Sequence, residues 1–177
     1  MKPPSLVSAH HFEGIGRVAV ACARLEFEQS KLTGALVATD PTVVSALVNP
    51  GEPFSRLQQL ARTLTVARFG TVRGATHPHP LAVELERWMT AARDLIERRN
   101  TYLHSLWGIG PDQQVGVITL RKPHQTMNVS LADLDALQRE IDEHIDRSQP
   151  LVQRVVAEVR AREAVVHSVL DEAESTQ

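Results

Sequence analysis

The sequence predicts a mainly α protein, a helical bundle of four to five helices with a small β-hairpin inserted after the third long helix. Apolar residues recur at helical spacings over several long stretches, and only one stretch, 114–122, has the pattern of a strand. Aromatic residues are 4% of the chain, so Ala, Leu and Val must fill the core, and Ala and Leu favour helices. With 42% hydrophobic residues, we expect one domain over residues 1–177 with a frayed tail at 171–177.

The first predicted helix spans about residues 8–38. Its apolar residues follow one stripe, although the glycines near both ends weaken the helical pattern. The single cysteine lies on this stripe and is expected in the core. Because the chain has only one cysteine, a disulfide framework or a cysteine zinc site within the chain is excluded. Asp40-Pro41 would end the helix, and 42–48 forms a short apolar segment. The stripe consists of Ile15, Val18, Cys22, Leu25, Leu32 and Leu36.

A second helix is predicted from a cap at Ser55 to about Phe69. Its inward residues would be Leu57, Leu60, Leu64 and Ala67. The loop that follows, residues 70–80, contains His77-Pro78-His79. Two histidines make an incomplete metal site, so the favoured interpretation is that these residues cap the next helix.

The third helix is predicted from Pro80, which suits the first helical position, to about Trp107. One residue, Arg99, interrupts its apolar stripe. A charge on a packed face is costly unless it is paired, so Arg99 marks either a functional site or an ion pair with Glu26 or Glu28 of the first helix. The stripe comprises Leu81, Leu85, Trp88, Ala92, Leu95, Tyr102 and Leu106.

The remaining elements follow a turn at residues 108–111 that is expected to end the third helix. The strand at 114–122 would pair with 127–130 as the hairpin. Ser130 and Asp133 form a capping pattern for a fourth helix, whose apolar face is Leu134, Leu137, Ile141 and Ile145. Pro150 is expected to kink or break this helix before a last one over about 151–170.

The formal net charge of −2 excludes a chain that grips nucleic acid over its whole surface, but it allows a local basic site. The turn at 121–124, Arg-Lys-Pro-His, is the strongest basic cluster and would either guide RNA or be a solvated turn. The chain shows no apolar signal core and no apolar run of about 18 residues. We therefore predict a cytoplasmic protein that does not contact a membrane.

The residues with the clearest chemistry are Arg99, Asn100 and His104. On a helix, residues 100 and 104 share a face, so Asn100 would orient the imidazole of His104. A histidine can take or give a proton near neutral pH, and an arginine can hold a phosphate and offset its developing charge. The 2′-hydroxyl of RNA could then act as the nucleophile, and no metal or other cofactor is required.

The run Arg98-Arg99-Asn100-Thr101-Tyr102-Leu103-His104 resembles the signature of the HEPN superfamily, which is an Arg followed by a polar residue and then a His. The resemblance implies a helical bundle, a homodimer and metal-independent endoribonuclease activity on RNA, in a toxin–antitoxin or defence system with an antitoxin as partner protein. We predict Arg99, Asn100 and His104 as catalytic residues. Substrate contacts are predicted for Arg98, Tyr102 and Ser105.

Spacing of Arg and His alone is uninformative, because chance gives about two such pairs in a chain of this composition. Requiring Asn directly after Arg leaves only Arg99. Two other interpretations stay open. In the first, the chain is a non-catalytic helical interaction module in which these residues form a buried polar network. In the second, it is a nucleotide-binding accessory of a modifying enzyme.

Overall fold

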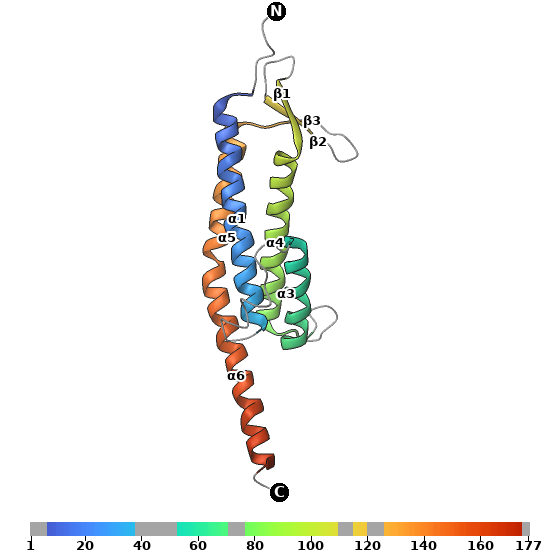
Figure 1. The fold of residues 1–177 in the computed structure, drawn as a ribbon, viewed down its shortest axis with the longest axis vertical. Helices are drawn as coiled ribbons and strands as arrows, with labels where there is room; N and C mark the ends of the chain where they lie inside the picture. The colour runs from blue at the N-terminus through green and yellow to red at the C-terminus, as the bar shows by residue number, and fades with distance from the viewer. Residues whose placement is uncertain (1–6, 38–52, 71–76, 110–114, 120–125, 175–177) are drawn as a thin grey trace, which may run out of the picture. The chain divides into compact units, whose positions relative to one another are not determined.

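The computed structural model describes residues 7–37, 53–70, 77–109, 115–119 and 126–174 (Figure 1). Its secondary structure confirms the predicted class, mainly α with a small antiparallel sheet. The helices are α1 (Ala9–Val37), α3 (Phe54–Phe69), α4 (Pro80–Leu103), α5 (Leu131–Asp146) and α6 (Ser148–Glu174). The strands are β1 (Ser105–Ile109), β2 (Val115–Thr119) and β3 (Thr126–Asn128).

The chain divides into two compact units, which are described in turn. The sheet unit consists of Met1–Leu25 and Ala91–Ile145, and the α3–α6 unit consists of Glu26–Thr90 and Asp146–Gln177. Both helices α1 and α4 therefore contribute one part to each unit. None of the helices in the described residues has the length and apolar character that a membrane span needs.

Helix α1 confirms the first predicted helix, and its glycines lie inside it. The carbonyl of Ser8 accepts hydrogen bonds from the N–H groups of His11 and Phe12 at the start of the helix. A Cβ atom at Gly14 would lie 2.9 Å from Cδ1 of Leu134, so this glycine lets the backbone of α1 pass close to α5. The stripe residues are fully or nearly fully buried except Ile15, which is half-buried: Val18, Cys22, Leu25, Leu32 and Leu36.

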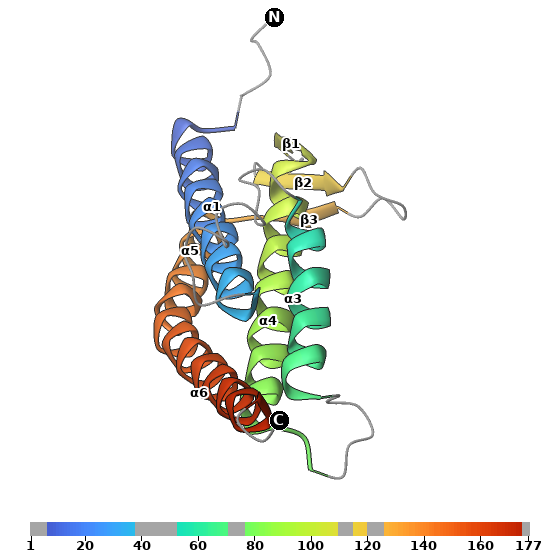
Figure 2. The same cartoon turned by 60° about the horizontal axis from the view of Figure 1, so that its bottom comes forward.

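Helix α5 of the sheet unit begins with the predicted capping pair. The backbone N–H of Asp133 donates to Oγ of Ser130 at 3.2 Å, and the N–H of Ser130 donates to the Asp133 carboxylate at 2.8 Å. This reciprocal pair satisfies two helix-end donors. The four predicted apolar residues of α5, Leu134, Leu137, Ile141 and Ile145, are all buried. Figures 1 and 2 both show α5 running beside the first half of α1.

The sheet is antiparallel with the order β1-β2-β3. The predicted hairpin corresponds to β2 and β3, where Val117 pairs with Met127. Strand β1 was not predicted: Ser105–Ile109 pairs with Thr119–Val115, so the expected continuation of the third helix to Trp107 and its end at residues 108–111 are wrong. The indole N–H of Trp107 donates to the carbonyl of Tyr102 at 2.7 Å, which satisfies one of the acceptors that the last turn of α4 leaves open.

In the α3–α6 unit, the predicted cap at Ser55 is wrong. Helix α3 begins at Phe54, directly after Pro53. The carbonyl of Pro53 accepts hydrogen bonds from the N–H groups of Arg56 and Leu57. Ser55 is thus already helical. The extended backbone of Pro53 takes the capping position, and no side chain caps this helix.

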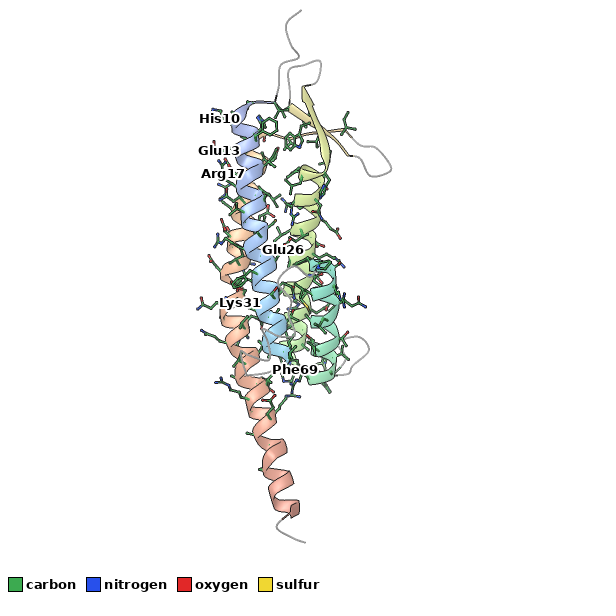
Figure 3. All side chains as sticks on the ribbon, in the orientation of Figure 1. His10, Glu13, Arg17, Glu26, Lys31 and Phe69 are labelled. Atoms are coloured by element: carbon green, nitrogen blue, oxygen red, sulfur yellow. The ribbon has the colours of Figure 1, made fainter. Side chains whose placement is uncertain are left out.

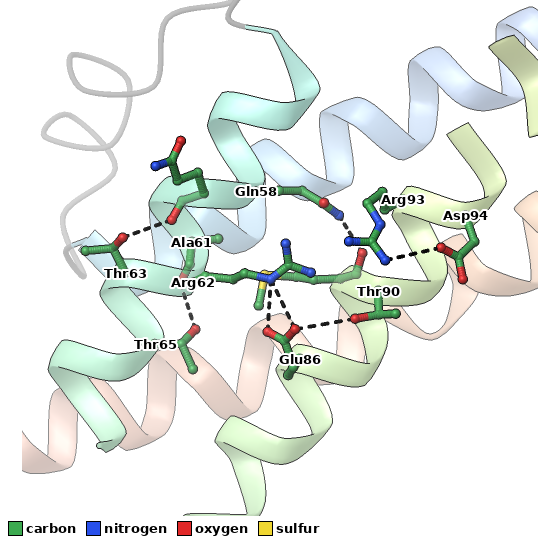
Figure 4. A network of polar contacts seen from close by, with 11 residues as sticks. Gln58, Ala61, Arg62, Thr63, Thr65, Glu86, Thr90, Arg93 and Asp94 are labelled. Carbon is green, nitrogen blue, oxygen red and sulfur yellow. Dashed lines mark hydrogen bonds and ion pairs between the residues drawn. The ribbon is translucent and has the colours of Figure 1, made fainter. Parts of the chain in front are cut away.

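The buried face of α3 also differs from the prediction, because it includes polar residues. Gln58 is buried and donates to the carbonyl of Met89 at 2.5 Å, and nearby Arg62 bonds Glu86 at 3.1 Å (Figure 4). These bonds make polar burial tolerable, since a buried polar group is costly only when it lacks a partner. The buried residues are Leu57, Gln58, Ala61, Thr65 and Phe69, whereas Leu60 and Ala67 are exposed and Leu64 is half-buried.

Helix α4 begins at Pro80 as predicted, and His79 caps it. The carbonyl of His79 accepts the N–H of Val83 at 3.2 Å. The imidazole ring of His79 stacks on the ring of Phe69, which is labelled in Figure 3, with 5.0 Å between the ring centroids. The Nε2 atom of His79 lies 3.5 Å from the Glu158 carboxylate. No cluster of three or more His, Cys, Asp or Glu residues suited to a metal ion occurs in the part of the chain that the structure describes. The backbone carbonyl of His79 thus lies at the capping position of α4.

Helix α6 begins at Ser148, so Pro150 lies in its first turn, where a missing N–H costs no helical hydrogen bond. Val155 and Val159 of this helix are buried. The helix continues to Glu174, through the first part of the predicted frayed tail. The predicted stop at residues 40–41, the segment 42–48 and the basic turn 121–124 lie outside the described residues.

Candidate functional site

The last two turns of α4, in the sheet unit, carry the predicted site. The apolar stripe that leads to it is buried as predicted: Leu81, Leu85, Trp88, Ala92 and Leu95. At the next position of this stripe, Arg99 is half-buried and its Nε atom is buried. An arginine can lie partly on an apolar face because its three methylene groups pack against apolar neighbours, although in Arg99 the Nε atom of the guanidinium is buried as well.

His104 lies directly after the last helical residue, Leu103, and is exposed to solvent. Its backbone N–H donates to the carbonyl of Asn100 at 3.0 Å, so the four-residue relation that the motif requires is preserved at the helix end. In the part of the chain that the structure describes, the side chains of Asn100 and His104 form no hydrogen bond with each other. Orientation of the imidazole by the Asn100 side chain stays a prediction.

Arg98 bridges α4 and α5. Its guanidinium forms a two-pronged ion pair with Glu140, in which Nη2 donates to Oε1 at 3.1 Å and Nη1 contacts Oε2. The pair lowers the pKa of Glu140 and raises the pKa of Arg98, in each case chiefly through the hydrogen bond between them. The two neighbouring arginines therefore differ, because Arg98 is exposed and holds a carboxylate while Arg99 is half-buried on the inner stripe.

Aromatic side chains adjoin the motif. The rings of Tyr102 and Trp107 lie edge to face with centroids 6.4 Å apart, and the ring of His11 lies 6.4 Å from that of Trp107. Burial raises the pKa of the Tyr102 hydroxyl. The prediction of Tyr102 as a substrate contact did not include Trp107 or His11. Their proximity arises from strand β1 and the start of α1, which no local sequence pattern connects.

Several other polar side chains have partners within their own unit. Ser105, predicted as a substrate contact, is the first residue of β1, and its hydroxyl donates to the carbonyl of Thr101. In the sheet unit, His10 is exposed, whereas His11 is half-buried and its Nδ1 lies 2.8 Å from the Ser8 hydroxyl. In the α3–α6 unit, the carboxylate of Glu28 accepts from Lys31 at 2.9 Å and from Ser148 at 2.8 Å.

Comparison of the chain with protein-family models, curated proteins and solved structures finds no match. The function must therefore be argued from the residues themselves.

The ion pair between Arg98 and Glu140 should give a pH-dependent contribution to stability. The pKa of Glu140 is lower in the folded chain than in the unfolded chain. The pair therefore stabilises the fold above the unfolded carboxyl pKa, and the contribution disappears as the pH falls through the folded pKa. Both side chains are about half exposed, so Arg98→Ala should cost only about 0.2–1 kcal/mol at neutral pH, measured by urea unfolding.

In strong acid the unfolding free energies of wild type and Arg98→Ala should converge. Glu140→Gln serves as the matched variant and should show the same cost at neutral pH and the same convergence. A difference that is unchanged in acid would show that Arg98 stabilises the fold through packing instead of through this ion pair.

Proposed function

We propose that the chain is a HEPN-like, cytoplasmic RNA-binding protein that cleaves RNA without a metal ion, at a site made by Arg99, Asn100 and His104, as part of a toxin–antitoxin or defence system. The observation that supports this best is the position of His104. Its imidazole is exposed at the end of α4, and its backbone is fixed by the hydrogen bond to Asn100. An exposed histidine in a fixed backbone can reach a large substrate and exchange its proton with solvent.

In the proposed reaction, His104 in its neutral form takes the proton of a ribose 2′-hydroxyl. The 2′-oxygen forms a bond to the adjacent phosphorus, and the bond from phosphorus to the 5′-oxygen of the next nucleotide breaks. That oxygen takes a proton from water, and His104 returns its proton to the hydroxide that remains, so the products are a 2′,3′-cyclic phosphate and a 5′-hydroxyl. Arg99 offsets the negative charge that builds up on the phosphate oxygens.

Incubation of the purified chain with single-stranded RNA in excess EDTA tests the proposal. We expect fragments that end in a 2′,3′-cyclic phosphate, identified by mass spectrometry. An oligonucleotide of the same sequence made of deoxyribose should stay intact because it lacks the nucleophile. Cleavage of the deoxyribose strand would contradict the mechanism, and intact RNA at high protein concentration would contradict the activity.

A further inference from the structure

Three ring-bearing side chains meet beside the Arg99–His104 motif in the sheet unit: His11, Tyr102 and Trp107, which we call the ring cluster. They come from the start of α1, the end of α4 and strand β1, which lie towards the same end of this unit in Figures 1 and 2. The chain has one tyrosine and two tryptophans. Its only tyrosine and one of its tryptophans therefore lie in the ring cluster.

The ring cluster is partly open to solvent, unlike the core. All three of its side chains are half-buried, whereas the other tryptophan, Trp88, is only 5% exposed. The planes of the Tyr102 and Trp107 rings are inclined by 61°, an edge-to-face arrangement in which one of the two rings keeps both faces clear of the other. A flat group can therefore still pack on the cluster.

The position of each ring is fixed by its neighbours. The indole N–H of Trp107 donates to the carbonyl of Tyr102 at 2.7 Å, and Val117, which pairs with Trp107 in the sheet, is fully buried. The Ser8 hydroxyl lies 2.8 Å from Nδ1 of His11 and holds the imidazole. A preformed surface loses little conformational entropy on binding, which favours a ligand.

The charges around the ring cluster argue against one class of ligand that rings bind, a cation. Two carboxylates, Asp133 and Glu140, lie close enough to Tyr102 to act on its hydroxyl electrostatically. The first accepts a hydrogen bond from Ser130 at the cap of α5, and the second is paired with Arg98. Because both carboxylates already have partners, the cluster lacks the negative charge that would hold a cation.

A nucleobase beside a phosphate fits the neighbouring side chains better. Arg99 lies three residues before Tyr102, so the two residues share a face of α4. The positive charge of Arg99 favours a flat group that carries a negative charge next to it. Burial raises the pKa of Tyr102, so its hydroxyl stays protonated at neutral pH and can donate to an acceptor atom of a base or a sugar.

We propose that the ring cluster binds an unpaired nucleobase of RNA by stacking, next to the phosphate that Arg99 holds. This inference rests on the proposed function, in which Arg99 and His104 contact the strand, and it adds that the chain recognises single-stranded RNA. A base inside a duplex is paired and stacked on both sides, so its faces cannot reach the rings. Stacking tolerates any sequence, because every base has a flat face.

Fluorescence anisotropy of a short labelled RNA tests the proposal without cleavage. Methylation of every 2′-hydroxyl blocks the nucleophile of the proposed reaction, so the strand stays intact. The wild-type chain should bind this single strand at least about tenfold more tightly than a strand of equal length without bases, and than the duplex of the same sequence. Adenosine monophosphate should compete at least about tenfold less well than the unlabelled strand, since it lacks the neighbouring phosphates.

Variants at Tyr102 separate the ring from its hydroxyl. Tyr102→Leu should weaken binding of the single strand by about 5–100-fold, the usual loss of one stacked base. Tyr102→Phe keeps the ring and should lose only about threefold, the value of one hydrogen bond. His11→Ala should weaken binding by roughly two- to tenfold. His10→Ala is its matched control at the adjacent exposed position and should bind as the wild type does. Thermal unfolding identifies any variant that does not fold.

Equal affinity of the wild type for the strands with and without bases would overturn the proposal, and this comparison needs no variant. Binding by folded Tyr102→Leu as tight as that of the wild type would overturn it as well, and equal competition by adenosine monophosphate would assign the rings to free nucleotides instead of RNA. Cleavage of RNA with base-independent binding would contradict the ring cluster alone. Base-dependent binding without cleavage would contradict the ribonuclease activity alone, and no binding of any strand would contradict both.

Discussion

Replacing His104 with alanine should reduce RNA cleavage by about 10²–10⁴-fold, the usual contribution of a general base. The side chain is exposed and lies outside the helix, so its removal should not change the melting temperature. Cleavage rates measured in excess EDTA, together with thermal unfolding of each variant, check both parts. His10→Ala is the matched control, because His10 is also exposed and lies in the same unit.

Arg99→Ala should reduce cleavage by about 10²–10³-fold if the guanidinium stabilises charge on the phosphate. Arg99→Lys should restore part of the rate, because it keeps the charge but loses the planar fork. The control is Arg93→Ala on the same helix, where the arginine pairs with Asp94 and Glu97 on the surface. Full activity of His104→Ala would exclude His104 as the base, whatever Arg99→Ala shows.

The helices were predictable because their signals are local. The stripe of α1, the first-position Pro80 of α4 and the Ser130–Asp133 cap of α5 each depend on residues less than two turns apart, and all three predictions are confirmed. The α3 face was not predictable in this way. Gln58 is buried because Met89, 31 residues away, offers a carbonyl, and a hydrophobic pattern cannot contain that bond.

The end of α4 was mispredicted for a similar reason. The stripe of α4 continues in phase to Leu106, so periodicity favours a longer helix. The chain instead becomes β1 because β2 supplies a pairing partner from a segment ten residues further on, with Trp107 opposite Val117. Tertiary pairing of this kind overrides local propensity.

The candidate site was likewise predictable where its features are local in the sequence and not where they depend on tertiary contacts. The sequence singled out Arg99 by its polar side chain on an apolar stripe, and in the structure Arg99 is half-buried there. The backbone N–H of His104 bonds the carbonyl of Asn100, and orientation of the imidazole by the Asn100 side chain stays a prediction. The rings of Trp107 and His11 beside Tyr102 could not be predicted, because α1 and β1 meet only in the folded chain.

The largest effect on stability should come from the core of the sheet unit. Leu137 on α5 is fully buried, and Leu137→Ala should lower the unfolding free energy by about 2–5 kcal/mol, since it removes buried apolar surface and leaves a cavity. For a chain of this length each kcal/mol corresponds to about 2–4 °C, so the melting temperature should fall by roughly 5–20 °C. Leu131→Ala at the exposed start of the same helix should cost less than about 1 kcal/mol.

Comparison of Arg99→Ala with Leu137→Ala distinguishes the two roles open to Arg99, which are membership of a buried polar network and binding of phosphate. If Arg99 belongs to a buried polar network, Arg99→Ala should destabilise the fold by about 3–5 kcal/mol, as much as Leu137→Ala. If Arg99 holds phosphate, Arg99→Ala should melt near the wild-type temperature yet lose cleavage, whereas Leu137→Ala should keep cleavage when assayed well below its own melting temperature. Arg99→Ala would then be impaired only in RNA cleavage and Leu137→Ala only in thermal stability. Loss of activity in Arg99→Ala could therefore not be attributed to unfolding.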